Sequence, residues 1–249
     1  MLRIAIQICS YLVGLPLEVL IVAALLRGAY RRFPFVFAYA VASLLASAVE
    51  LPLYITWCLD KGSRILYVRT YWIAERILLP LVYAVVISLI YEASAQLRSR
   101  RMVRTLVIAG ALLFAGITFL IHFDRQIWAV GEWMTPWTRD LNFCAAVLDL
   151  GLWTLLIGSR KKDKRLLVLS GALGIQFTGE AIGESIRQMA QAGQRSLLSY
   201  GASLWIAATN IVFLYMWWQA FRPAAPRKTP PSAASMELSA TLPSNEEQP

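Results

Sequence analysis

Acidic side chains stand at several points inside long apolar runs of this sequence, where ionisable residues are rare. Four of them, on four different runs, are Glu50, Glu75, Asp149 and Glu180. On insertion scales an acid at the centre of a membrane helix costs on the order of 2.5–3.5 kcal/mol, so such residues usually face a bundle interior or a wet cavity. Carboxylates there could bind a cation, a proton or a polar organic solute. We expect the four to converge on one cavity and to make ligand binding or conformation depend on pH.

Polar residues inside these runs recur at intervals of three or four residues, which places each set on one face of a helix. The sets are Gln7, Tyr11, Gly14 and Glu18; Ser43, Ser47, Glu50 and Tyr54; Asn142, Ala146, Asp149 and Trp153; and Gln176, Glu180, Glu184 and Arg187. A further pair, Ser203 and Asn210, stands seven residues apart on the last run. The pattern predicts a shared polar seam inside a helical bundle. It adds Gln176, Glu184 and Asn210 to the candidate ligand-binding residues.

A structural interpretation of the same residues stays open. Arg76 and Arg187 could form ion pairs with nearby glutamates, and Asp149 could be held by Asn or Ser neighbours. Polar contacts between membrane helices contribute only ~0.6 kcal/mol each on average. The protein would then be receptor-like or a scaffold that acts through a partner chain. A polar cavity open to one side favours the first hypothesis, a small-solute or proton-coupled transporter or solute-binding protein, whereas acids paired with these arginines favour the second.

Several enzyme classes lack their signature residues in this sequence. The chain has one histidine, which excludes a multi-histidine metal site. It contains no G-x-S-x-G turn and no P-loop. Its three cysteines form no C-x-x-C pair. The sequence therefore leans against an enzyme and predicts no catalytic residue, metal site or cofactor.

The elements that must position these residues follow from composition. The 249 residues are 58% apolar and only 16% charged, whereas soluble domains are about 25% charged. A membrane-spanning helix needs about 20 predominantly apolar residues, and runs of this length must be helical because lipid offers the backbone no hydrogen bonds. The runs are Ile4–Leu26, Phe33–Cys58, Tyr71–Ser94, Val103–Phe123, Leu141–Ser159, Leu166–Met189 and Leu198–Phe221. We predict an all-α integral membrane protein, a seven-transmembrane-helix bundle in which the fourth helix is peripheral and lipid-facing.

Charges between the runs predict the orientation. Lys and Arg are nearly twice as frequent in one set of connections as in the other, and the rich set consists of residues 27–32, 98–104, 160–165 and 222–228. The positive-inside rule places these segments in the cytoplasm. The N-terminus is therefore predicted to lie outside and the C-terminus in the cytoplasm, most plausibly at a bacterial inner (plasma) membrane.

Two segments outside the spans have their own composition. Residues 1–222 form the predicted transmembrane domain, and residues 223–249 are too poor in apolar side chains to pack, which predicts a disordered cytoplasmic tail. The longest outer connection, Asp124–Asp140, carries Trp128, Trp133 and Trp137. An aromatic belt at the headgroup level is the favoured interpretation of these tryptophans, and a lid over an external pocket is the alternative.

Partners and packing complete the sequence-based expectations. The net charge is +9, but the cations flank apolar runs, where they meet lipid headgroups rather than nucleic acid. Expected partners are the bilayer, a small polar or cationic solute and, under the second hypothesis, another protein chain. The small-residue pairs Ser170–Gly174 and Gly179–Gly183 predict close helix approach. Kinks are predicted at Pro16, Pro52 and Pro80.

Overall fold

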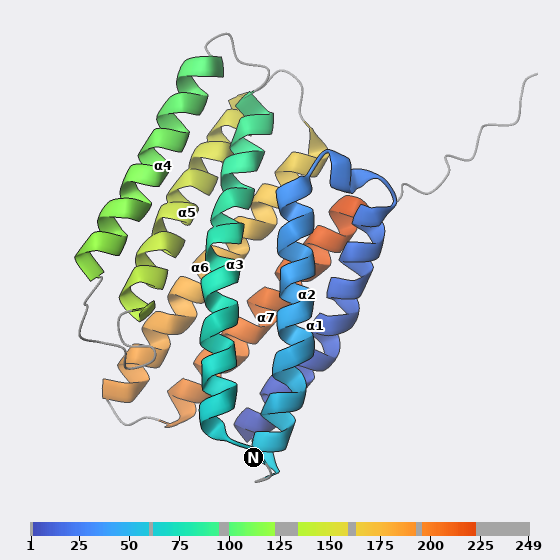
Figure 1. Ribbon diagram of the computed structural model, residues 1–249, viewed down its shortest axis with the longest axis vertical. Coiled ribbons are helices and arrows are strands. Elements are labelled where there is room, and N and C mark those ends of the chain that lie inside the picture. The colour runs from blue at the N-terminus through green and yellow to red at the C-terminus, as the bar shows by residue number, and fades with distance from the viewer. Residues whose placement is uncertain are drawn as a thin grey trace, which may run out of the picture.

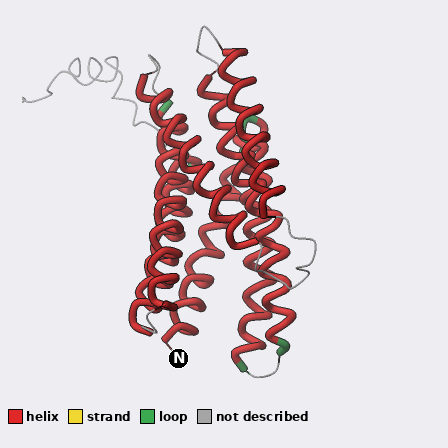
Figure 2. Tube along the Cα trace, turned by 90° about the vertical axis from the view of Figure 1, so that its left-hand side faces the viewer, coloured by secondary structure: helices red, strands yellow, loops and turns green. Residues whose placement is uncertain are grey.

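Helices account for the secondary structure throughout the described part of the chain. A computed structural model describes residues 2–59, 62–94, 100–122, 134–158, 163–192 and 196–222, and within these ranges every regular element is a helix (Figure 2). The predicted tail 223–249, Trp128 and Trp133 lie outside the described residues. The all-helical prediction is confirmed, and the helices are long and apolar enough for a membrane protein of several spans.

The helices correspond to the predicted apolar runs and extend several of them. They are α1 (Leu2–Leu26), α2 (Pro34–Cys58), α3 (Arg64–Ala93), α4 (Arg100–His122), α5 (Met134–Gly158), α6 (Lys164–Ala192) and α7 (Ser196–Phe221), with the short 3-10 helix η1 (Ala29–Arg31) between the first two. Two helices, α3 and α5, begin well before their predicted runs. The first turns of α3 are apolar and belong to its span Ile65–Ala93, so the predicted start at Tyr71 is too late, whereas the first turns of α5 carry the polar residues Thr135 and Arg139. The second half of the predicted outer connection, from Met134, is therefore helical.

Six helices surround a common interior. Pairwise packing runs from α1 to α2, α2 to α3, α3 to α5, α5 to α6, α6 to α7 and from α7 back to α1, which closes a ring. Across this ring α3 also contacts α6. Within the described residues the same six helices are long and apolar enough to cross a membrane, whereas α4 contains a shorter apolar segment, Val107–Ile121, so the count of seven spans stays a prediction.

The peripheral position predicted for α4 is confirmed. This helix packs against α5 and α3 at one edge of the bundle (Figure 1). Large apolar side chains cover its outer surface: Leu112 is 64% exposed and Leu120 is 75% exposed. An apolar surface of this kind is stable only in contact with lipid or with another apolar surface.

The bundle is held together by an apolar core to which all seven α-helices contribute buried side chains. Trp217 is the largest fully buried side chain, and its ring lies 4.6 Å from Phe213 and 5.6 Å from Tyr39 between centroids.

The three prolines at which kinks are predicted, Pro16, Pro52 and Pro80, stand inside α1, α2 and α3. The turn from α1 into α2 uses Gly28 at φ 125°, a left-handed conformation that favours glycine.

The close approach predicted for the Gly179–Gly183 pair is confirmed. A Cβ atom at Gly179 would lie 2.5–2.6 Å from side-chain atoms of Thr209, and one at Gly183 would collide with Ile206. Both partners belong to α7, so the glycines let the two backbones come together. Small residues allow this kind of packing between membrane helices, where van der Waals contact is a main source of association.

The ends of several helices meet at one end of the bundle. Arg32, just before α2, forms ion pairs with Glu92 near the end of α3 and with Asp163 just before α6, at 2.8 and 3.0 Å. All three residues stand in or beside segments predicted to be cytoplasmic. Their common location agrees with the predicted alternation of the spans, while the side of the membrane on which they lie stays a prediction.

Candidate functional site

The polar stripes predicted on the first two runs face each other across the α1–α2 interface. Tyr11 donates a hydrogen bond to Glu50 Oε2 over 2.9 Å. Glu18 stands about two helical turns after Tyr11 on α1. Its Oε1 atom accepts hydrogen bonds from Ser43 at 2.6 Å and Ser47 at 3.2 Å. The two carboxylates therefore occupy successive levels of one interface, and each is held by the opposite helix.

Glu18 and Glu50 are buried in the bundle, with 5% and 8% of their surface exposed. Their hydrogen-bond partners are neutral hydroxyl groups. The second oxygen of Glu18, Oε2, is buried and has no hydrogen-bond partner among the described residues. Burying a charged carboxylate without a positive partner is costly, so such a group is expected either to bind a cation or to take up a proton and become neutral.

Two further acids, on other helices, lie within electrostatic range of residues at or beside this interface. Glu50 lies within electrostatic range of Glu18 and of Glu75 on α3. The hydroxyl group of Tyr39 on α2 lies within electrostatic range of Glu18, Glu75 and Glu180, the last of these on α6. We call Glu18, Glu50, Glu75 and Glu180 the interior acid cluster. It draws one residue from each of four helices of the ring.

Two side-chain amide groups donate hydrogen bonds to Glu180. Asn142 on α5 donates a hydrogen bond to Glu180 Oε2 over 3.3 Å. Gln176, one turn earlier on α6, donates to Glu180 Oε1. The predicted α5 and α6 stripes therefore also meet. The buried Oε1 atom of Gln176 has no hydrogen-bond partner within the part of the chain that the structure describes.

Asp149 belongs to a different environment between α5 and α6. Its Oδ1 atom accepts a hydrogen bond of 2.7 Å from Ser170, and the carboxylate is 2% exposed. Both members of the predicted small-residue pair, Ser170 and Gly174, lie against this carboxylate. A Cβ atom at Gly174 would lie 3.1 Å from Asp149 Oδ2. Asp149 thus stands with Ser170 between α5 and α6, and the convergence of Glu50, Glu75, Asp149 and Glu180 on one cavity stays a prediction.

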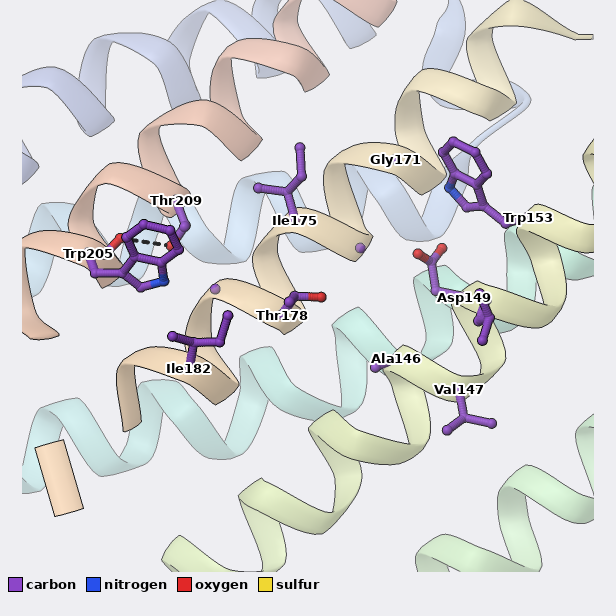
Figure 3. Close-up of a pocket in the computed structure, with 13 residues that line it drawn as sticks. Ala146, Val147, Asp149, Trp153, Gly171, Ile175, Thr178, Ile182, Trp205 and Thr209 are labelled. Atoms are coloured by element: carbon purple, nitrogen blue, oxygen red, sulfur yellow. Dashed lines mark hydrogen bonds between the residues drawn. The ribbon is translucent and has the colours of Figure 1, made fainter. Parts of the chain in front are cut away.

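A cavity of about 720 Å³ adjoins Asp149 on the side of α6 that lies between α5 and α7. Figure 3 shows the Asp149 carboxylate pointing toward α6 near Gly171, with Trp153 and Trp205 at opposite ends of the cavity. Its lining is otherwise mainly aliphatic and glycine. Among the four predicted acids this cavity touches only Asp149, so it is not the cavity expected to join them.

The other predicted residues lie at various places on the same helices. Asn210 is half-buried on α7, and Arg187 is half-buried near the end of α6. Arg76 is exposed on α3, next to Glu75. Glu184 stands on α6, and its side chain lies outside the described part of the structure. Ion pairing of Arg76 and Arg187 with the acids remains a prediction.

Sequence reasoning did not select two residues of the interior. Glu18 stood on a predicted stripe, seven residues after Tyr11, and this spacing was the signal that could have identified it. Tyr39 gave no such signal, because a tyrosine near the end of an apolar run is typical of an interfacial aromatic residue. Its position beside three acids depends on the way α2 packs against α1, α3 and α7.

Comparison of the chain with known protein families, with curated proteins and with solved structures finds no match. The chemistry of the site is therefore argued from its geometry. Among the described residues no three His, Cys, Asp or Glu side chains are placed to hold one metal ion. What the geometry offers is a pair of buried carboxylates, Glu18 and Glu50, that accept hydrogen bonds from hydroxyl groups.

Proposed function

We propose that this multi-pass membrane protein is a proton-coupled transporter or solute-binding protein whose interior acid cluster binds a proton or a small cationic solute. The observation that carries the proposal is the pair Glu18 and Glu50, two buried carboxylates on adjacent helices that are hydrogen-bonded to hydroxyl groups only. A hydroxyl group donates a hydrogen bond but leaves the charge in place. A proton or a cationic ligand would complete the site.

The chemical class of the ligand follows from the donor set. A divalent metal ion prefers several carboxylate or carbonyl oxygens around one point, and no such grouping of acids exists among the described residues. Glu18 and Glu50 are instead spaced along the α1–α2 interface, each with its own donors. This arrangement favours protons, which bind one carboxylate at a time, or an extended organic cation.

The position of the cluster suggests how binding would reach the rest of the protein. Its acids belong to α1, α2 and α3, which are successive helices of the ring, and to α6, which contacts α3 across it. Like charges in this interior repel, and neutralising one of them weakens the repulsion. A ligand that binds one arrangement of the helices better than another shifts the population toward it. Coupling of protonation to helix movement is the step that transport would need.

Asp149 fits the structural interpretation better than the functional one. It is 2% exposed, bonded to Ser170, and enclosed by a glycine of the neighbouring helix. These features are those of a packing contact between α5 and α6. The receptor-like or scaffolding alternative extends this interpretation to all the acids, and the experiment below separates the two.

The test follows conformation against pH in lipid nanodiscs, with intrinsic tryptophan fluorescence as the measurement. The variants are Glu18→Gln and Glu50→Gln, which keep the size and the hydrogen-bond acceptor. Glu92→Gln is the matched control, since it makes the same chemical change at an ion pair outside the cluster. We expect a pH-dependent change in the parent that is moved or lost in the two cluster variants and kept in the control. Superimposable curves for all four proteins would show that the acids are packing elements.

A further inference from the structure

A second cavity, independent of the acids, lies where α1, η1, α6 and α7 meet. Its volume is about 360 Å³. Three of the residues that line it are arginines, Arg27, Arg32 and Arg165, and none is acidic. Phe33 and Phe221 form its apolar floor, with ring centroids 6.0 Å apart in an edge-to-face arrangement. We call this cavity the basic pocket.

The three guanidinium groups are not equivalent. Arg32 is fixed by the carboxylates of Glu92 and Asp163. Partial burial disfavours its charged form, but the hydrogen bonds and charges of these two acids outweigh that effect and raise the pKa of Arg32 above its ordinary value. The Arg32 guanidinium group at the wall of the pocket is therefore already paired with two carboxylates.

Arg27 and Arg165 are the cations that a ligand could engage. Both side chains are exposed, and neither forms an ion pair with a described residue. Asp163 accepts a hydrogen bond from the backbone N–H of Arg165, which fixes the start of α6 without using the guanidinium group. With three arginines against two carboxylates, the pocket and its supporting acids retain a positive charge.

The shape of the pocket suits an anionic group that approaches the backbone closely. Gly28 lies in its wall at φ 125°, and nothing lies within 4 Å of the place where a Cβ atom would stand. The volume is many times the ~30 Å³ that one water molecule occupies in the liquid. There is room for a phosphate group together with the glycerol or similar unit attached to it. Arginine is the residue best suited to bind phosphate, because its planar fork matches two oxygens at once.

We propose that the basic pocket binds an anionic phosphate ester, between the guanidinium groups of Arg27 and Arg165 and against Arg32. Its place at the ends of α1, α6 and α7, on the side predicted to be cytoplasmic, makes a phospholipid headgroup the favoured source. Basic pockets between membrane helices on that side are suited to such headgroups. A water-soluble phosphate ester has the same chemistry, and the experiment distinguishes the two sources.

The experiment measures the thermal unfolding midpoint of the purified full chain in neutral detergent. Phosphatidylglycerol is added in one series, phosphatidylcholine in the second and glycerol phosphate in the third. The pocket variant is Arg27→Gln/Arg165→Gln. The matched control, Arg31→Gln/Arg101→Gln, removes the same charge from exposed residues that do not line the pocket. Retention of phosphatidylglycerol in native mass spectrometry provides a second readout that does not depend on stability.

We expect phosphatidylglycerol to raise the midpoint of the parent and the control more than phosphatidylcholine does, and the pocket variant to lose this gain and the retained lipid. A gain from glycerol phosphate that is also lost in the pocket variant would support the pocket with a soluble ligand as the source. Equal responses of the pocket variant and the control would overturn the proposal, because general attraction to a basic surface would then explain them. The absence of any response to phosphate esters would overturn it as well.

Discussion

Replacing Gly179 with alanine is the sharpest available test of how α6 packs against α7. The added Cβ atom would lie 2.5–2.6 Å from the Cβ, Cγ2 and Oγ1 atoms of Thr209. Carbon atoms in good contact are about 3.5–4.0 Å apart. The two helices must therefore separate by about 1 Å, or Thr209 must leave its position.

The magnitude follows from comparison with a glycine that has free space. Nothing lies within 4 Å of a Cβ atom placed at Gly201 on α7, so Gly201→Ala gains only the difference in helix propensity, up to about 1 kcal/mol. Gly179→Ala shares that gain and adds the overpacking penalty, which is typically about 1–3 kcal/mol. The difference between the two variants isolates the packing term.

The free energy of unfolding is measured by titration with a denaturing detergent in mixed micelles, with tryptophan fluorescence as the signal. We expect Gly179→Ala to be less stable than Gly201→Ala by about 1–3 kcal/mol. Thr209→Gly removes all three contacting atoms, so Gly179→Ala/Thr209→Gly should cost less than the sum of the two single variants. Equal stability of Gly179→Ala and Gly201→Ala would refute the close contact between α6 and α7.

Three further predictions concern other parts of the molecule. Ser170→Ala leaves Asp149 Oδ1 buried without its 2.7 Å donor and should lower the free energy of unfolding by about 1–3 kcal/mol. The control Ser185→Ala removes an exposed hydroxyl group that is bonded within its own helix, so it should change this free energy little. Arg32→Gln breaks two ion pairs whose side chains are 29–49% exposed, so it should cost less than about 1 kcal/mol, and the difference from the parent should shrink in high salt. A topology reporter fused after Arg222 should be active in the cytoplasm and one placed at Gly131 should report the outer side, and the opposite pattern would reverse the predicted orientation.

Helix positions and contacting faces could be predicted from the sequence because lipid leaves the chain few choices. Apolar runs of sufficient length must be helical, and the described helices occupy the predicted runs. Residues at intervals of three or four share a face, so the stripes containing Glu18 and Ser47 could be recognised before their partners were known. The hydrogen bonds between them show that these stripes meet.

The order of helices around the ring could not be predicted in the same way. Consecutive helices with short connections are expected to be neighbours, yet α3 packs against α5 within the ring while α4 lies outside it. This arrangement decides which acids meet. The spacing of residues along the fifth run predicted that Asp149 lies on a polar face of its helix. The packing of α5 against α6 is what places its carboxylate beside Ser170.

Infrared difference spectroscopy of the carboxyl groups tests the central claim most directly. The carbonyl stretch of a protonated carboxylic acid is separate from the bands of a carboxylate, so a change of pH reveals which buried acids exchange protons. We predict a protonation-dependent carboxyl band in the parent that Glu18→Gln or Glu50→Gln removes in part, and that Glu92→Gln leaves unchanged. A spectrum that is the same in the parent and in both cluster variants would show that these acids exchange no proton, and the proton-binding role would be contradicted.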